Sequence, residues 1–230
     1  MADENIAIEA LHLSSMEYCR EYLIDEPEII DISISVSVAD LEIEKKRYEM
    51  TEPSDEPYVE TLCIFRKIAE AMPLKRALLF HSSAISVDGN AYLFTAPSGT
   101  GKSTHTRLWR EALKERAVMV NDDKPFLKFT DEGLFVYGNP WTGKEGLGQN
   151  MSAPVKGICY LVQAPENSLR RLSPDEAFPF LCTQVYMPES EDAGIETYEM
   201  IGEITENIPV YELKCTPDSR AFEEAFKMTK

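Results

Sequence analysis

The sequence predicts a layered α/β fold built on a mixed β-sheet, preceded by a small α+β appendage. Beyond residue 76, apolar strand-like segments alternate with helix-like segments and with hairpins, which is the order expected of a layered α/β domain. Residues 1–75 follow a different pattern, in which one alternating segment and one amphipathic segment are separated by polar residues. We therefore expect an α+β appendage over residues 1–75, packed on a main domain over residues 76–230.

Composition and charge are those of a globular protein and exclude several kinds of partner. The chain has 230 residues, of which 43% are hydrophobic, and its formal net charge is −17. A duplex-binding protein or an anionic membrane surface would require a basic footprint, so we expect no nucleic-acid and no membrane partner. No apolar run approaches the roughly 18 residues of a membrane span, and the N-terminus lacks the basic start of a signal peptide. We expect a cytoplasmic protein with reduced, widely spaced cysteines, and a homo-oligomer is left open.

Two segments define the expected appendage. Ile30–Val38 alternates apolar and polar residues, which predicts a half-buried strand. Val59–Ala71 carries apolar residues at helical spacing and is stopped by Met72-Pro73, which predicts a helix. The stretch Met50–Pro57 between them is polar and rich in turn-forming residues.

The main domain is expected to contain further strands and helices in alternation. The predicted strands are Ala77–Ile85, Ala91–Thr95 after a turn at Asp88-Gly89-Asn90, Val118–Val120, the hairpin Phe126–Phe129 with Leu134–Tyr137, and Ile158–Gln163. The predicted helices are Lys102–Glu115, Asp175–Leu181 and Ser219–Met228. His105 and Trp109, four residues apart on the first helix, are expected to be structural.

Residues 96–103 carry the most specific motif of the chain. Their sequence, Ala-Pro-Ser-Gly-Thr-Gly-Lys-Ser, fits the phosphate-binding P-loop, with Ala96 at the position of the first glycine. In such a loop the backbone N–H groups surround phosphates, the lysine reaches the β- and γ-phosphates, and the final hydroxyl binds Mg²⁺. The alternative, a glycine-rich turn that caps a helix, is disfavoured by the strand before the loop and the amphipathic helix after it. The expected nucleotide-binding residues are Pro97, Ser98, Gly99, Thr100, Gly101, Lys102, Ser103 and Thr104.

Two carboxylates follow the next predicted strand. Asp122 and Asp123 come directly after Val118–Val120 and Asn121, where one can hold Mg²⁺ and the other can accept a proton from an attacking hydroxyl. Taken alone, such a pair is more often a solvated turn. His81, at the end of an apolar run, is on its own more often structural than catalytic.

The glycine-rich segment Gly138–Gly148 is expected to be a mobile loop that closes over phosphates or substrate. Trp141 would form part of this lid, Lys144 would contact phosphate, and Glu145 is a candidate metal ligand. The alternative is an exposed connection between two strands.

The residues from Phe80-His81 through the 97–103 motif to Asp122-Asp123 resemble HPr kinase/phosphorylase and its relatives, which share the P-loop fold of phosphoenolpyruvate carboxykinase. The interval from His81 to Lys102 matches the family pattern without a gap, and the resemblance is strongest over residues 79–123. It implies a mixed-sheet P-loop core and a kinase that uses ATP and Mg²⁺ to phosphorylate a hydroxyl. It also implies Asp122 as the acid/base residue, His81 and Lys102 as catalytic residues at the transferred group, and Ser103, Asp123 and Glu145 on the metal side.

The chain also departs from this family. Ala96 replaces the usual glycine, and the Gly/Arg-rich segment with which such kinases grip their carrier protein is not found. The expected acceptor is therefore a small-molecule hydroxyl or a peptide or protein serine. An ATP-binding regulator with little turnover is the alternative, although a pure binder has no need of a base. A decarboxylating carboxykinase would need a larger substrate lobe.

Overall fold

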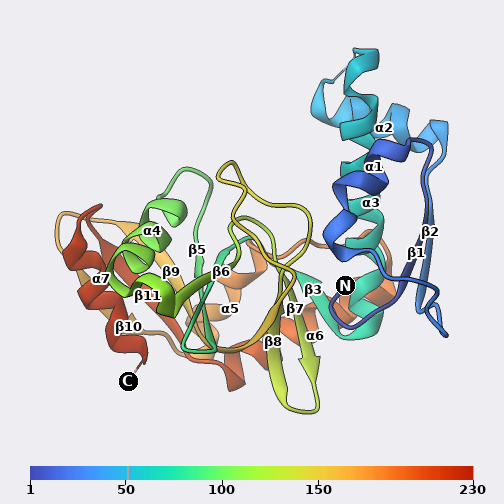
Figure 1. Cartoon of the computed structure of the whole chain (residues 1–230). Coiled ribbons are helices and arrows are strands. Elements are labelled where there is room, and N and C mark those ends of the chain that lie inside the picture. The colour runs from blue at the N-terminus through green and yellow to red at the C-terminus, as the bar shows by residue number, and fades with distance from the viewer. Residues whose placement is uncertain (51, 230) are drawn as a thin grey trace.

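A nine-stranded mixed β-sheet forms the centre of the computed structural model, which describes residues 1–50 and 52–229 (Figure 1). The strand order is β3-β7-β8-β9-β5-β4-β6, and β11 and β10 extend the sheet from β9. The strands are β3 (Ala77–Leu79), β4 (Ser83–Val87), β5 (Asn90–Thr95), β6 (Ala117–Asn121), β7 (Phe126–Thr130), β8 (Gly133–Tyr137), β9 (Ser152–Gln163), β10 (Ser168–Arg171) and β11 (Val210–Cys215). The predicted mixed α/β architecture is confirmed.

Four strands of this sheet end at the same edge. β9 pairs in parallel with both β5 and β11. β4 is antiparallel to both β5 and β6, so β6 runs in the same direction as β5. The carboxyl ends of β5, β6, β9 and β11 therefore meet at one edge, which is where open α/β sheets bind their ligands.

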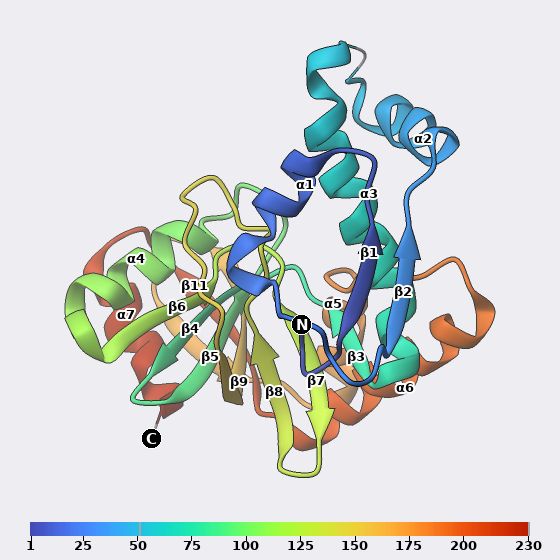
Figure 2. The same cartoon turned by 45° about the vertical axis from the view of Figure 1, so that its right-hand side comes forward.

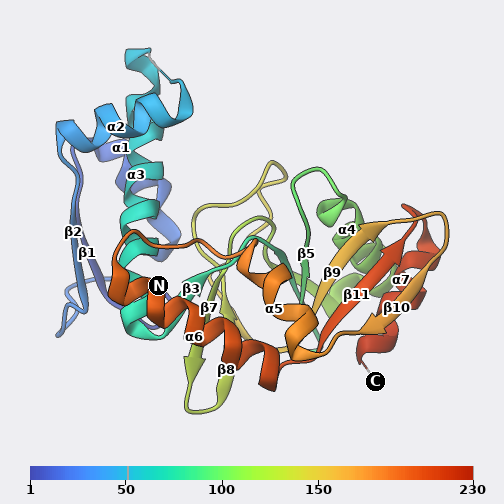
Figure 3. The ribbon, with the colours of Figure 1, turned by 180° about the vertical axis from the view of Figure 1, so that it is seen from behind.

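Helices cover both faces of the sheet. On one face lie α4 (Lys102–Leu113) and α7 (Ser219–Ala225), and on the other α5 (Pro174–Cys182) and α6 (Glu191–Asn207) (Figure 3). The alternation of side chains along β5 supplies both interfaces, because Leu93 packs in the cluster with α5 and α6 while Phe94 packs in the cluster with α4 and α7. Short 3₁₀ helices occur at Arg20–Tyr22, Pro53–Asp55, Met72–Lys75, Lys114–Arg116 and Phe226–Thr229.

The N-terminal appendage stands at one end of the sheet (Figures 1 and 2). It consists of β1 (Ile6–Glu9), which pairs in parallel with β2 (Ile32–Ser35), and of the helices α1 (Leu13–Tyr18), α2 (Val38–Tyr48) and α3 (Glu56–Ala71). The strand predicted within residues 30–38 is confirmed as β2, whose two isoleucines are buried and whose two serines are exposed. The helix predicted over residues 59–71 is confirmed as α3.

The appendage and the sheet share one hydrophobic cluster. Val59, Ile64 and Ile68 of α3 pack in the same cluster as Leu79, Phe126 and Trp141 of the main domain. The ring of Phe65 stacks on Trp141 with 4.4 Å between centroids and 11° between planes. The proposed division at residue 75 therefore crosses a continuous core, and it stays a prediction about the organisation of the chain.

The expected elements differ from the structure in several places. The strand expected over residues 77–85 is two strands, because the backbone leaves β7 after Leu79 and the N–H of Ser82 bonds the carbonyl of Asp123 instead (3.0 Å). The helix expected over residues 102–115 ends at Leu113 and continues as a 3₁₀ turn. The elements that were not predicted are β1, α1, α2, α6, β10 and β11. Thr51, in the predicted turn, and Lys230 lie outside the described residues.

Among residues 1–50 and 52–229, none of the helices is long and apolar enough to cross a membrane.

Candidate active site

The 96–103 loop connects β5 to α4 at the edge where the four strands end. Gly99 and Gly101 have φ angles of +80° and +116°, a conformation that glycine adopts without steric cost. A Cβ atom at either position would meet no atom within 4 Å, so conformation rather than space requires glycine there. Because α4 begins at Lys102, its first N–H groups and its positive dipole end adjoin the loop. This geometry suits an anion.

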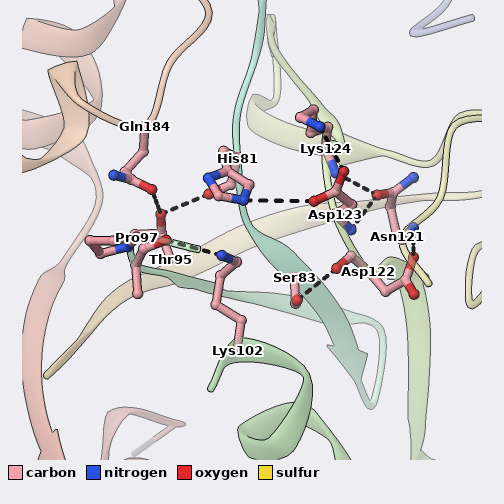
Figure 4. A network of polar contacts seen from close by, with 12 residues as sticks. His81, Ser83, Thr95, Pro97, Lys102, Asn121, Asp122, Asp123, Lys124 and Gln184 are labelled. Atoms are coloured by element: carbon pink, nitrogen blue, oxygen red, sulfur yellow. Dashed lines mark hydrogen bonds and ion pairs between the residues drawn. The ribbon is translucent and has the colours of Figure 1, made fainter. Parts of the chain in front are cut away.

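Lys102 is buried and its side chain folds back onto the loop. Its Nζ donates a hydrogen bond to the carbonyl of Ala96 at 3.0 Å (Figure 4). Burial lowers the pKa of Lys102, Asp123 acts in the opposite direction, and Lys124 adds to the lowering. The ammonium group thus lies inside the loop and interacts electrostatically with the charges of Asp123 and Lys124.

Two asparagines hold the turn that carries the aspartates. Asn121 ends β6, and its Oδ1 accepts hydrogen bonds from the N–H groups of Asp123 (2.9 Å) and Lys124 (2.8 Å). Its Nδ2 donates to the carbonyl of Trp141 (3.1 Å). Asn139 completes the brace, because its Nδ2 donates to the carbonyl of Lys124 (2.6 Å) and its Oδ1 accepts from the N–H of Trp141 (2.9 Å). Neither asparagine was among the predicted site residues.

The carboxylates of Asp122 and Asp123 point in different directions (Figure 4). Asp122 is buried, and it accepts hydrogen bonds from the N–H groups of Gly143 (2.6 Å) and Leu147 (3.4 Å). Asp123 is partly exposed, with Oδ1 3.7 Å from His81 Nε2 and Oδ2 2.8 Å from Lys124 Nζ. The carboxylate beside His81 is therefore that of Asp123, whereas Asp122 anchors the following loop. The acid/base role expected of Asp122 stays a prediction that this geometry does not favour.

His81 lies between β3 and β4, and its backbone is fixed on both sides. Its N–H donates to the carbonyl of Gln184 (2.7 Å), and its own carbonyl accepts from Thr95 Oγ1 (2.8 Å) at the end of β5. Burial and the positive charge of Lys102 lower the pKa of His81, and Asp123 opposes this shift. A neutral imidazole beside Asp123 is therefore favoured at neutral pH.

The Gly138–Gly148 loop is attached to the core at several points. A Cβ on Gly138 would lie 1.9 Å from the carbonyl oxygen of Gln149, so close backbone packing requires glycine there. Trp141 was expected to belong to a mobile lid, and this expectation is wrong, because the indole is buried against Phe65. The tip of the loop, Gly143 to Leu147, is bound to Asp122.

The two charged residues expected to act from this loop lie near its tip. The carboxylate of Glu145 forms an ion pair with Arg110 of α4 (3.0 Å), and Lys144 is exposed and forms no ion pair with any residue in the described ranges. The structure thus pairs Glu145 with α4 rather than with Asp123. The roles of Lys144 and Glu145 toward phosphate and metal stay predictions.

The residues that could hold Mg²⁺ are few. Among residues 1–50 and 52–229, no three His, Cys, Asp or Glu side chains come close enough together to bind a metal ion. Mg²⁺ at a nucleotide site uses only one or two protein oxygens beside phosphate oxygens and water. The exposed hydroxyl of Ser103 and the carboxylate of Asp123 are hard oxygen donors and fit this requirement.

A cavity of about 350 Å³ adjoins the 96–103 loop at Gly99, Thr100 and Gly101. The first turns of α4 contribute Thr104 and Leu108, and the segments that follow β9 and β11 contribute Ala164 and Pro217. Gln163 Nε2 donates to the carbonyl of Thr100 (3.0 Å) and joins the end of β9 to the loop. The volume and position of the cavity leave space for a planar group beside phosphates that are bound on the loop.

His105 is a structural residue, as expected. Its Nε2 accepts a hydrogen bond from Trp109 Nε1 (3.1 Å), and its ring lies 4.6 Å from that of Phe94. Burial lowers the pKa of His105 to about 4. The unfolded chain binds a proton near pH 6.5 and the folded protein does not, so folding stability falls as the pH drops from 6.5 to 4.

We expect His105→Gln to lose less folding stability at low pH than the parent does. The glutamine keeps an acceptor for Trp109 but does not titrate. Between pH 7 and 4.5 the unfolding free energy of the parent should fall by about 2 kcal/mol more than that of the variant, measured by urea denaturation. If the unfolding free energies of the parent and of His105→Gln fell equally between pH 7 and 4.5, His105 would be shown to accept a proton in the folded state.

Comparisons with known proteins leave the family unassigned. No family model matches the sequence, and no curated protein matches it. Among solved structures, the chain is similar to an HPr(Ser) kinase/phosphatase from Coxiella burnetii, with 16% identity and a TM-score of 0.36, over 66% of this chain and 86% of that chain.

Proposed function

We propose that the protein is a Mg-ATP-dependent kinase that transfers the γ-phosphoryl group to a serine-type or small-molecule hydroxyl. The observation that carries this proposal is the convergence of Lys102, His81 and Asp123 beside a glycine loop at the carboxyl edge of the sheet. A lysine inside an anion-binding loop, next to a carboxylate and a neutral histidine, supplies what phosphoryl transfer to an alcohol requires. The resemblance of residues 79–123 to the HPr kinase family also supports a kinase.

In this proposal the β- and γ-phosphates bind the N–H groups of the 96–103 loop. Lys102 exchanges its bond to the Ala96 carbonyl for bonds to phosphate oxygens, and the nucleoside occupies the 350 Å³ cavity. Ser103 and Asp123 would hold Mg²⁺, which would neutralise phosphate charge.

The transfer step follows from the position of Asp123. The acceptor oxygen attacks the γ-phosphorus and forms a bond to it. At the same time the bond between the γ-phosphorus and the β,γ-bridging oxygen breaks, and ADP leaves with the electron pair of that bond. The acceptor proton passes to the Asp123 carboxylate. Lys102 and His81 face the charge that spreads over the transferred group. Asp122 fixes the 143–147 segment through two backbone N–H groups and is a positioning residue in this proposal.

The nucleotide part of this proposal is tested by Lys102→Ala. Loss of the charge contact should raise the Kd of Mg-ATP at least tenfold, equivalent to about 1.4 kcal/mol, in isothermal titration. Lys156→Ala, at an exposed position of β9, is the matched control and should bind as the parent does. Equal binding by the parent and Lys102→Ala would show that the motif is only a turn. Tight Mg-ATP binding without transfer of labelled phosphate to any acceptor would support the ATP-binding regulator instead.

The 143–147 segment offers a second test, by hydrogen exchange. Because Gly143 and Leu147 donate to Asp122, we expect their amides to be protected without nucleotide and to exchange at least about tenfold faster in Asp122→Ala. Asp131→Ala, in the exposed turn between β7 and β8, should leave them unchanged. We expect Mg-ATP to close the segment further and so to increase the protection of these amides. Equal, strong protection with and without Mg-ATP would remove Lys144 and Glu145 from the site.

A further inference from the structure

A separate cavity of about 150 Å³ lies between the appendage and the main domain. Asp123 and Lys124 are among the residues that border it, and the Asp123 carboxylate lies 3.7 Å from His81 Nε2. Half of the twelve residues that line it are aromatic, and these come from both parts of the chain: Tyr18, Tyr48, Tyr58, Phe65, Trp141 and Tyr186. No catalytic or nucleotide-binding role assigned above uses the appendage side of this cavity.

The cations in the cavity wall are already paired within the protein. Arg66 donates from Nε and Nη2 to the buried carboxylate of Glu44, with its shortest contact at 2.7 Å. Lys124 Nζ lies 2.8 Å from the Asp123 carboxylate. The positive charges of Arg66 and Lys124 are therefore balanced by protein carboxylates, and Arg66 Nη1 also contacts the Tyr186 hydroxyl (3.4 Å). This pairing weakens the attraction of the cavity wall for a ligand carboxylate or phosphate.

The aromatic rings favour a different ligand charge. The faces of Tyr and Trp rings attract ammonium groups as well as apolar groups. The formal net charge of −17 also raises the local concentration of cations around the protein. A volume of 150 Å³ holds a molecule of about the size of benzene, so the ligand is a compact compound rather than the surface of a folded protein.

We propose that this cavity is the acceptor site and that it binds a compact amino alcohol, with the hydroxyl at Asp123 and the ammonium group among the aromatic rings. This inference rests on the proposed kinase function and narrows its acceptor class. It also gives the N-terminal residues a role, because Tyr18, Tyr48 and Tyr58 then form the specificity wall of the site.

Binding can be tested without nucleotide, through the tryptophan that lines the cavity. Trp109 is buried beside α7 and Trp141 borders the cavity, so a change in emission that disappears in Trp141→Phe reports on the cavity. The probes are serinol, glycerol and D-glycerate, which share a three-carbon skeleton with a primary alcohol and differ in charge. We expect the Kd of serinol to be at least about tenfold lower than that of D-glycerate. Equal or tighter binding of D-glycerate would overturn the ligand class, and no response to any probe would overturn the cavity assignment.

Transfer kinetics separate this inference from the proposed function. Tyr58→Ala should raise the KM for serinol about tenfold and leave the Kd of Mg-ATP unchanged, because Tyr58 borders the acceptor cavity and does not line the 350 Å³ cavity beside the 96–103 loop. Tyr198→Ala, at a tyrosine of α6 with the same half-exposed character, is the matched control and should leave both values unchanged. Phosphorylation of serinol with an unchanged KM in Tyr58→Ala would overturn the cavity and leave the kinase proposal intact. Serinol binding without Mg-ATP binding would overturn the kinase proposal alone.

Discussion

Asp123→Asn should lower the rate of phosphoryl transfer by roughly 100-fold or more, the usual scale for loss of a general base. The amide cannot take the acceptor proton, yet it can still accept a hydrogen bond from Lys124 and leaves the Asn121 brace intact. The Kd of Mg-ATP should change by less than about threefold, because the loop amides and Lys102 provide most of the phosphate contact. Single-turnover transfer of labelled phosphate and a separate titration of Mg-ATP measure the two quantities.

Asp122→Asn is the matched control for this prediction. Its carboxylate binds Gly143 and Leu147, so the substitution should act through the loop and lower transfer less than Asp123→Asn does. A larger loss in Asp122→Asn would restore Asp122 as the acid/base residue, as the family resemblance implies. Recovery of Asp123→Asn at high Mg²⁺ would instead identify Asp123 as a metal ligand only.

Trp141→Ala should lower the free energy of unfolding by about 3–5 kcal/mol, as expected for removal of a large buried aromatic ring. The indole is 5% exposed and stacks on Phe65 of α3, so its loss opens a void between the appendage and the sheet. Urea denaturation followed by circular dichroism measures the change. Because the cluster is shared, we expect a single transition in both proteins.

Trp141→Phe distinguishes the loss of volume from the loss of the indole N–H. That N–H is buried and has no hydrogen-bond partner within residues 1–50 and 52–229, so phenylalanine removes an unsatisfied donor and keeps most of the ring. We expect this variant to lose less than about 1.5 kcal/mol. Two separate transitions, or an alanine variant as stable as the parent, would show that the appendage folds independently.

The parts of the fold that the sequence predicted are those with a strong local pattern. β5, α4 and β6 were predicted because apolar runs flank a glycine motif, and α3 because its apolar residues repeat at helical spacing. α2 also carried a local signal, since Ser37 and Asp40 form a capping box at its start, and α6 places Met200 and Ile204 at helical spacing. β10 and β11 are short strands that pair with each other, and β11 also pairs with β9, so these strands depend on partners that a local pattern does not reveal.

The site was predicted in its residues more than in its geometry. Sequence located the aspartate pair, but adjacent residues after a strand point to different sides, and only the fold shows that Asp123 faces His81. The asparagine brace depends on the position of Asn139 relative to Asn121, which the sheet sets. Trp141 lies among glycines and looked like a loop residue, because its partner Phe65 is distant in sequence.

The contacts between the appendage and Tyr186 have a consequence for synthesis on the ribosome. Arg66 and Glu70 of α3 bond the Tyr186 hydroxyl, and Glu70 also accepts from the N–H of Glu189. These partners emerge from the ribosome long after α3, as does Trp141, since translation proceeds from the N-terminus. The part of the apolar face of α3 that packs on the main domain therefore stays without its native cover while most of that domain is made. Nascent chains of this protein are accordingly expected to need protection by a chaperone until residue 189 has emerged.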